Sequence, residues 1–233
     1  FFLVGAWWTG RGRAPIAPAD WARILALAFV GYYVSSLANF LGLRHLSVGL
    51  ERMILYTYPS LVMVGSALFL GQRLRPRAIA AMLVSYAGLG VGFLAEMRVD
   101  PGSRWLLGAG LVFASAVTYA VFTTGSGEMI RRLGPVRFMS WCVAASGIMV
   151  LLHFGFTHEV AALARLPGKA WTLGAIMATV ATVLPSYLFG WGLQRAGATA
   201  ASVIGMVGPV ATFVLAWAVL GESIFVLQLS GLA

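Results

Sequence analysis

Long apolar stretches joined by short polar connections dominate the pattern along the chain. Seven of these stretches approach or exceed the roughly 20 apolar residues that a helix needs to cross the hydrocarbon core. The connections carry glycine, proline and arginine, which mark helix ends. Asp20 is expected to cap the first complete helix, which should begin near Trp21. We therefore predict complete membrane-spanning helices at residues 21–43, 46–70, 78–95, 105–124, 138–156, 171–193 and 196–220.

Two shorter apolar stretches lie at the ends of the sequence. Residues 1–8 and 224–233 are too short to cross a membrane on their own. We interpret them as stubs of two further helices, so that the sequence would be truncated at both ends.

An ungapped internal repeat with an offset of 150 residues relates the two halves of the chain. Gly42 pairs with Gly192, and one proline inside each of two predicted spans pairs with the other, Pro59 with Pro209. Duplicated membrane halves are typical of secondary transporters. The repeat predicts an all-α, ten-helix protein with five helices in each half. An odd number of helices per half inverts the second half relative to the first.

The boundary between the repeats is predicted at the turn Asp100-Pro101-Gly102-Ser103. The first repeat would occupy residues 1–99, without its first helix and most of its second. The second would occupy residues 104–233, with its last helix incomplete.

Composition supports a membrane protein. Hydrophobic residues make up 60% of the chain and charged residues only 10%, with a net charge of +9, whereas soluble domains carry about 25% charged residues. Sorting arginine and lysine by loop gives ten on one side of the membrane against five on the other. By the positive-inside rule the richer side is cytoplasmic, in an inner or plasma membrane, and no nucleic-acid partner is needed to explain the charge. The richer set comprises Arg11, Arg13, Arg23, Arg73, Arg75, Arg77, Arg131, Arg132, Arg137 and Arg195.

Several kinds of chemistry are not expected from the motifs. The sequence has no phosphate-binding G-x-x-x-x-G-K-[ST] loop, which argues against ATP hydrolysis. His45, His153 and His158 show no metal-ligand spacing with Cys142, so no metal site and no cofactor are predicted.

Glu51 is the strongest candidate for function, because a charged group inside a membrane helix costs a few kcal/mol by insertion scales. Its counterpart in the second repeat is Ala201, and that of the adjacent Arg52 is Ser202. The charges therefore break the internal symmetry, as a site for an asymmetric substrate must. We interpret Arg52 as reaching toward the lipid headgroups, and Glu51, whose side chain is shorter, as a functional carboxylate.

Pro59 and Pro209 mark equivalent breaks in the two halves, which point to a site near the bilayer midplane. A packing kink inherited from the ancestral repeat is the competing interpretation. Polar stripes support a cavity more weakly, because small hydroxyl residues more often bridge helices than bind substrates. The stripes are Tyr32, Ser36 and Asn39; Thr179, Thr182 and Ser186; and Ser115, Thr118, Tyr119 and Phe122. The predicted substrate or proton pathway contains Glu51, Asn39, Tyr56, Pro59, Tyr119, Ser186 and Pro209.

Particular segments resemble the EamA-type members of the drug/metabolite transporter superfamily. They are Ser47 to Pro59, Gly71-Gln72-Arg73-Leu74, Gly197-Ala198-Thr199-Ala200-Ala201, Gly208-Pro209-Val210-Ala211-Thr212 and Leu220-Gly221-Glu222. The first repeat has Gln72 where the second keeps Glu222, so this position is expected to be structural. The resemblance implies ten helices with both termini cytoplasmic, and a central cavity between inverted repeats.

The leading hypothesis is a secondary active transporter of small metabolites, amino acids or drugs that works by alternating access, with Glu51 as the candidate for proton coupling. Its expected partners are a small-molecule substrate and the lipid bilayer, and a homodimer is left open. One alternative is a membrane-embedded enzyme with Glu51 as acid or base, which lacks a second catalytic group. Another is a membrane scaffold without transport activity.

Overall fold

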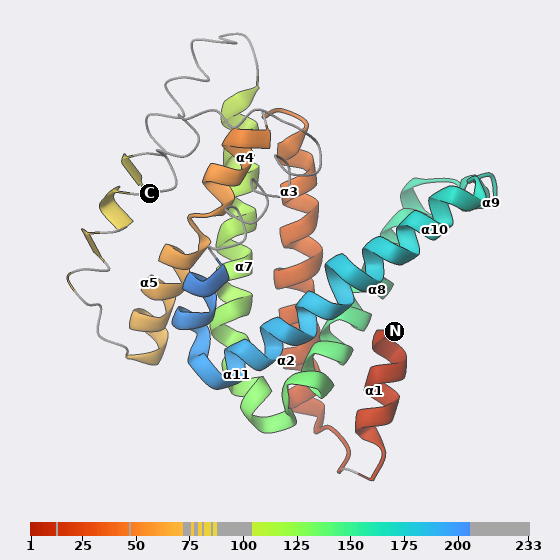
Figure 1. Ribbon diagram of the computed structural model, residues 1–233, viewed down its shortest axis with the longest axis horizontal. Helices are drawn as coiled ribbons and strands as arrows, with labels where there is room; N and C mark the ends of the chain where they lie inside the picture. The colour runs from red at the N-terminus through yellow and green to blue at the C-terminus, as the bar shows by residue number, and fades with distance from the viewer. Residues whose placement is uncertain are drawn as a thin grey trace. The chain divides into compact units, whose positions relative to one another are not determined.

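The computed structural model describes residues 1–12, 14–46, 48–71 and 104–205, together with 76, 79–80, 82–84 and 86–87 (Figure 1). Throughout this part of the chain the regular structure is helical, which confirms the all-α prediction. The helices are α1 (Phe2–Gly10), α2 (Pro18–Ala28), α3 (Ser35–Leu43), α4 (Val48–Leu55), α5 (Tyr58–Leu70), α7 (Trp105–Leu133), α8 (Pro135–Thr157), α9 (Ala161–Ala164), α10 (Gly168–Met177) and α11 (Leu184–Gly205), with π-helices η1 (Phe29–Val34) and η2 (Ala178–Val183).

Five helical stretches are long and apolar enough to cross a membrane: Pro18–Leu43, Leu50–Leu70, Trp105–Leu133, Pro135–Thr157 and Gly168–Ile204. This chain is a multi-pass membrane protein. The predicted span 196–220 lies mostly outside the described residues, as do much of 78–95 and the whole of the stub 224–233. The ten-helix inverted repeat and its boundaries stay a prediction.

The longest stretch, Gly168–Ile204, is too long to be one span. Its 37 residues would measure about 55 Å as a straight helix, against a hydrocarbon core of about 30 Å. The backbone leaves helical geometry at Gly197, where φ is 79°. Glycine adopts this left-handed conformation without steric cost. The break falls one residue beyond the predicted start of the span at 196.

The chain forms two compact units, each drawn from both halves of the sequence. Unit 1 contains residues 1–34 and 125–197, and unit 2 contains 35–124 and 198–233. In unit 1, α1, α2 and η1 pack against α8 (Figure 1). In unit 2, a core of Leu50, Ile54, Ala109 and Val112 joins α4 to α7.

Unit 2 also contains a close approach of α3 to α7. A Cβ added to Gly42 would lie 2.7 Å from a methyl of Val112 and 2.8 Å from the carbonyl oxygen of Gly108. Small residues at such crossings let two membrane helices touch along their backbones. Gly192, which the repeat pairs with Gly42, faces open space.

The two π-helices lie at equivalent places in the repeat. η2 begins 149 residues after η1 (Ala178 against Phe29), one residue short of the sequence offset. π-Helical turns are rare, and they occur frequently at functional sites. A duplicated ancestor with such a turn in this helix would account for both.

Ion pairs gather where α2 begins and α7 ends in unit 1. Arg132 lies 2.6 Å from Asp20, and Arg23 lies 3.3 Å from Glu128. Arg137, at the start of α8, donates to the carbonyl of Ala14. These ends therefore lie together in unit 1, and their common side of the membrane stays a prediction. That this side is cytoplasmic stays a prediction.

The prediction that Asp20 caps α2 is wrong. The helix begins at Pro18, its N-cap position is Ala17, and no side chain caps it. Pro18 suits a first helical position because its missing N–H has no acceptor there. Asp20 lies within the first turn instead, where its carboxylate accepts from Arg132. α7, which carries Arg132, runs nine residues past its predicted end at 124.

Candidate functional site

The helix that contains Pro59 is interrupted just before the proline. α4 ends at Leu55, the chain turns at Tyr56 and Thr57, and α5 begins at Tyr58 with the proline in its first turn. Pro59 has no N–H to donate to the carbonyl of Leu55, which would be its partner in a continuous helix.

Thr57 stabilises this turn from both its backbone and its side chain. Its amide donates to the carbonyl of Ile54 over 3.0 Å, and its hydroxyl donates to the same oxygen over 2.7 Å. Irregular backbone inside a membrane is tolerated only within protein or beside a cavity. Thr57, Tyr58 and Pro59 are all buried, in agreement with that rule.

Glu51 lies one turn before this break and is almost wholly buried, with 2% of its side chain exposed. Its Oε2 is 3.2 Å from Nε of Arg52, whose side chain is 56% exposed. The guanidinium of Arg52 therefore places a positive charge beside the carboxylate, but the two groups are not aligned for a hydrogen bond. Neither Glu51 oxygen accepts a hydrogen bond from any part of the chain that the structure describes. The carboxylate is therefore desolvated and only partly compensated.

Arg52 connects Glu51 to the turn. The backbone amide of Tyr56 donates to the carbonyl oxygen of Arg52 over 3.0 Å. The structure thus links Glu51, Arg52 and Tyr56 at the end of α4. Tyr56 is half-buried, at the point where α4 ends.

Tyr58 joins the break to two other helices of unit 2. Its hydroxyl donates to the carbonyl of Ser202 in α11 over 3.1 Å. Its ring lies edge-on to Tyr119 of α7, with 5.3 Å between the centroids. Tyr119, a predicted site residue, is thereby in contact with the residue that precedes Pro59. Sequence reasoning did not select Tyr58, although the tyrosine beside a mid-span proline is a visible signal.

The predicted polar stripes are only partly preserved. Asn39 is half-buried, and its Oδ1 is buried without a hydrogen-bond partner among the described residues. Ser36 is exposed, whereas its neighbour Ser35 is buried and bonds to Ser115 across 3.0 Å. The pair Ser35–Ser115 joins α3 to α7, and Ser35 was not among the predicted polar residues.

Ser186 is buried in unit 1, but Thr179 and Thr182 of the same predicted stripe are exposed. The π-helix η2 contains both threonines and ends just before the serine, so α-helical spacing does not place them on one face. Pro209 lies outside the described residues. Within the described part of the chain, His, Cys, Asp and Glu side chains form no group of three that could hold a metal ion.

The model of the EamA-like transporter family matches residues 1–93 and 106–233. The chain belongs to the EamA-like transporter family. The match leaves a gap at 94–105, which contains the turn predicted to separate the repeats.

Three curated relatives carry names of uncharacterized transporters. The one from Bacillus subtilis is 28% identical over 208 residues, covering 86% of this chain and 65% of the relative. The one from Synechocystis is 31% identical, covering 54% of this chain and 38% of the relative. The one from Archaeoglobus fulgidus is 24% identical, covering 91% of this chain and 74% of the relative. This chain therefore spans less than two thirds of the length of the first two.

A solved crystal structure of a protein shares the fold. It aligns with 99% of this chain and 78% of its own, with a TM-score of 0.70 and 20% sequence identity. The helical arrangement of this EamA-like chain is therefore one that has been observed by experiment.

Proposed function

We propose that this EamA-like chain belongs to a secondary active transporter that moves small metabolites, amino acids or drugs across a membrane by alternating access, with Glu51 on the substrate or proton pathway. The observation that carries the proposal is the buried, incompletely paired carboxylate of Glu51, one turn before a broken membrane helix. The family match and the names of the relatives support the transporter class.

Burial gives the carboxylate a physical role. An ion removed from water loses several kcal/mol of solvation, and an attraction to one half-exposed cation without aligned hydrogen bonds restores only part of it. A proton or the ammonium group of a solute would supply the missing partner. Either one binds or leaves when the surroundings of Glu51 change, which is the requirement for coupling in a transporter.

The broken helix supplies the means for such a change. The turn at Tyr56 and Thr57 separates two rigid helical segments, and a few loop residues of this kind absorb large backbone rotations in hinge motions. Because Arg52 lies 3.2 Å from Glu51 and its carbonyl accepts from the amide of Tyr56, a rotation at the turn alters the charge that Glu51 meets. Tyr58, on the other side of the turn, holds α5 to α7 and α11.

A membrane-embedded enzyme would need a second group beside Glu51 that acts on the substrate. The partner that the structure gives Glu51 is Arg52, a cation that cannot act as a nucleophile. We therefore propose a carrier that does not convert its substrate.

Reconstitution in liposomes with an enclosed pH-sensitive dye tests this function. Amino acids and small metabolites are added one at a time, and uptake of each labelled solute is measured in parallel. The proposal expects at least one solute to accumulate inside unchanged. Chemical conversion of that solute by the protein would favour an enzyme. Thermal unfolding of the purified protein is measured with the same solutes, and the absence of any stabilisation across the panel would favour a scaffold.

A further inference from the structure

Unit 2 contains five of the six buried side-chain atoms that lack a hydrogen-bond partner among the described residues. Two of the five are the hydroxyls of Ser66 and Thr124, which can donate as well as accept. The other three are oxygens that only accept: Oε1 and Oε2 of Glu51, and Oδ1 of Asn39. Unpaired buried polar atoms are rare in folded proteins, and an absent water or ion is one explanation for them. Glu51 and Asn39 therefore need a donor that the described chain does not supply.

Asn39 lies on the side of α3 that faces α7. Ser35, four residues before it, bonds to Ser115 of α7 across 3.0 Å. Gly42, three residues after it, approaches α7 so closely that an added Cβ would lie 2.7 Å from a methyl group of Val112. Residues three and four positions apart share one face of a helix. Asn39 is therefore on the same face as the two contacts, between them.

Glu51 lies on the side of α4 that faces the same part of α7. Ile54 and Leu55, three and four residues after Glu51, pack in the core that joins α4 to α7. That core contains Val112, which α3 also approaches. α3 and α4 contact each other as well. Glu51 and Asn39 thus belong to two helices that meet around Val112.

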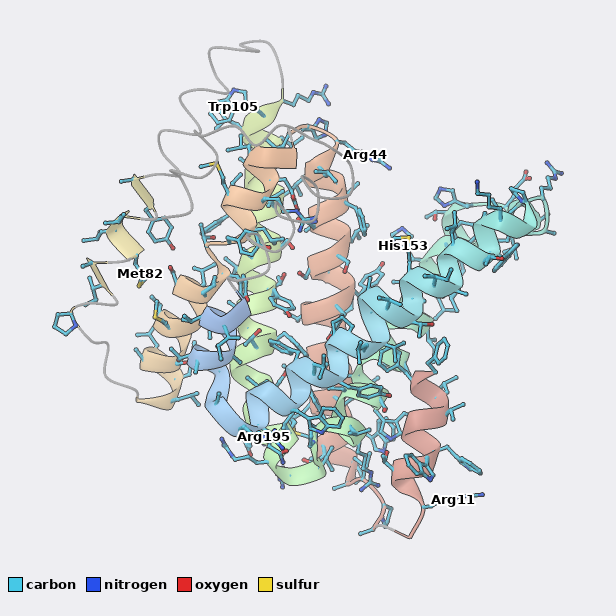
Figure 2. All side chains as sticks on the ribbon, in the orientation of Figure 1. Arg11, Arg44, Met82, Trp105, His153 and Arg195 are labelled. Carbon is cyan, nitrogen blue, oxygen red and sulfur yellow. The ribbon has the colours of Figure 1, made fainter. Side chains whose placement is uncertain are left out.

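The direction of the helices agrees with these contacts. α3 ends just before Arg44, α7 begins at Trp105, and Figure 2 shows both labelled residues at the same end of the two helices. The core between α4 and α7 has only apolar side chains, which donate no hydrogen bonds. A buried acceptor left without a donor is costly, and more so when it is charged. A bound group that brings its own donors removes this cost.

A primary ammonium group matches the three oxygens in number and in charge. It has three N–H donors and one positive charge, as the lysine side chain does. A proton would satisfy only one of the three oxygens. Calcium and magnesium ions take six or more oxygen ligands, whereas Glu51 and Asn39 offer three. A neutral amide or alcohol brings donors but leaves the charge of Glu51 unbalanced.

Arg52 does not already provide these donors. Its Nε is 3.2 Å from Oε2 of Glu51, yet neither oxygen of Glu51 accepts a hydrogen bond from the described residues. The side chain of Arg52 is 56% exposed. A long arginine side chain can reach outward to a polar medium. Arg52 can therefore balance the carboxylate in the empty site and move away when a better aligned cation enters.

We propose that the solute of this protein carries a primary ammonium group, which Glu51 and Asn39 bind between α3 and α4, beside Val112. This assignment rests on the proposed transport function and narrows its substrates to amines, amino acids included. The carboxylate supplies the charge and two acceptors, and the amide oxygen of Asn39 supplies the third.

Four butyl compounds provide the probes, because they share one apolar chain. The purified protein is titrated with butylammonium, butyltrimethylammonium, butanol and butyrate, and Kd is measured by calorimetry. The quaternary ion keeps the positive charge but has no N–H donor. We expect butylammonium to bind at least about tenfold more tightly than the quaternary ion, because hydrogen bonds to a charged group are lost. Butanol and butyrate should bind more weakly than butylammonium.

Variants separate the number of donors from the size of the ion. Asn39→Leu removes one acceptor and should weaken butylammonium about tenfold while leaving the quaternary ion unchanged. Asn39→Asp keeps an acceptor oxygen and should bind butylammonium at least as tightly as the wild type. The matched control is Ser66→Ala, which removes a buried hydroxyl without a partner from α5 of the same unit and should keep the wild-type Kd.

Three results would overturn the assignment: no binding of butylammonium, equal Kd values for the two ammonium ions, or an unchanged preference in Asn39→Leu. Uptake of labelled solutes into liposomes keeps this assignment apart from the transport function. Uptake confined to solutes without an ammonium group would remove the assignment and leave transport intact. Binding of butylammonium with the expected preference, but without uptake of any solute, would keep the ammonium site and remove transport.

Discussion

The hydroxyl of Tyr58 donates to the carbonyl oxygen of Ser202 over 3.1 Å, although 144 residues separate the two. Tyr58 precedes Pro59, and Ser202 lies seven residues before Pro209 in the second repeat. Ser202 is also the repeat counterpart of Arg52. The helix break of the first half is thus bonded to the corresponding helix of the second half within unit 2. Substrate sites of duplicated transporters lie where the repeats meet.

Replacing Tyr58 by phenylalanine should lower stability by about 0.5–1.5 kcal/mol, the typical net contribution of one hydrogen bond. The ring contact with Tyr119 remains in this variant, whereas Tyr58→Ala loses both interactions and should cost more. Thermal unfolding in detergent measures both. Equal Tm values for Tyr58→Phe and the wild type would show that the bond to Ser202 contributes nothing.

Gly42→Ala and Gly192→Ala form a matched pair, because the repeat places the two glycines at equivalent positions. A Cβ at Gly42 would meet Val112 and the backbone of Gly108 below 3 Å, so we expect a loss of about 1–3 kcal/mol from overpacking. A Cβ at Gly192 meets nothing within 4 Å. The higher helix propensity of alanine should leave that variant neutral or up to about 1 kcal/mol more stable. The reverse order of Tm values would show that the α3–α7 approach is looser than described.

The two ion pairs at the start of α2 should differ in strength. Arg132→Gln leaves the buried carboxylate of Asp20 without its 2.6 Å partner, and we expect a loss of about 1–3 kcal/mol. Arg23→Gln removes an exposed partner of Glu128 and should cost less than about 1 kcal/mol. Added salt should shrink the smaller effect first. Denaturation at low and high salt compares them, and a larger cost for Arg23→Gln would refute this ranking.

Hydropathy was sufficient to place most of the described helices, because a span requires about 20 apolar residues whatever surrounds it. The predicted spans 21–43, 105–124 and 138–156 lie within observed helical stretches, and 46–70 does so apart from the residues before α4 and the turn near Pro59. The glycines predicted to end helices also marked helix boundaries correctly. Gly71 ends α5 with a positive φ of 66°, and Gly134 precedes α8 with a φ of 87°.

Two features lay beyond the reach of the pattern. A π-turn changes the rotation of a helix without changing its hydropathy, so η1 and η2 left no mark in the apolar sequence. They nevertheless decide which polar residues share a face. The prediction that Thr179, Thr182 and Ser186 share one face assumed α-helical spacing, which η2 does not have. The contact of Tyr33 with His153 depends on packing between segments 120 residues apart, and no single-sequence signal predicts such a meeting.

The candidate site was predictable in its backbone and less so in its contacts. A proline in mid-span and a charge that breaks the repeat pointed to Pro59 and Glu51 from sequence alone. The direct approach of Arg52 to Glu51 was not foreseen, because adjacent helical residues point about 100° apart. A long side chain folds back across that angle and brings Nε within 3.2 Å of the carboxylate.

The most direct test of the account compares Glu51→Gln with Glu128→Gln in liposomes. Both changes neutralise one carboxylate, but Glu51 is buried beside the helix break and Glu128 is 60% exposed in a surface ion pair. The measurement is solute-dependent proton flux, read by an enclosed pH-sensitive dye. We predict that Glu51→Gln abolishes the flux while Glu128→Gln retains it. Flux retained at the wild-type rate in Glu51→Gln would contradict the account and make Glu51 a structural residue.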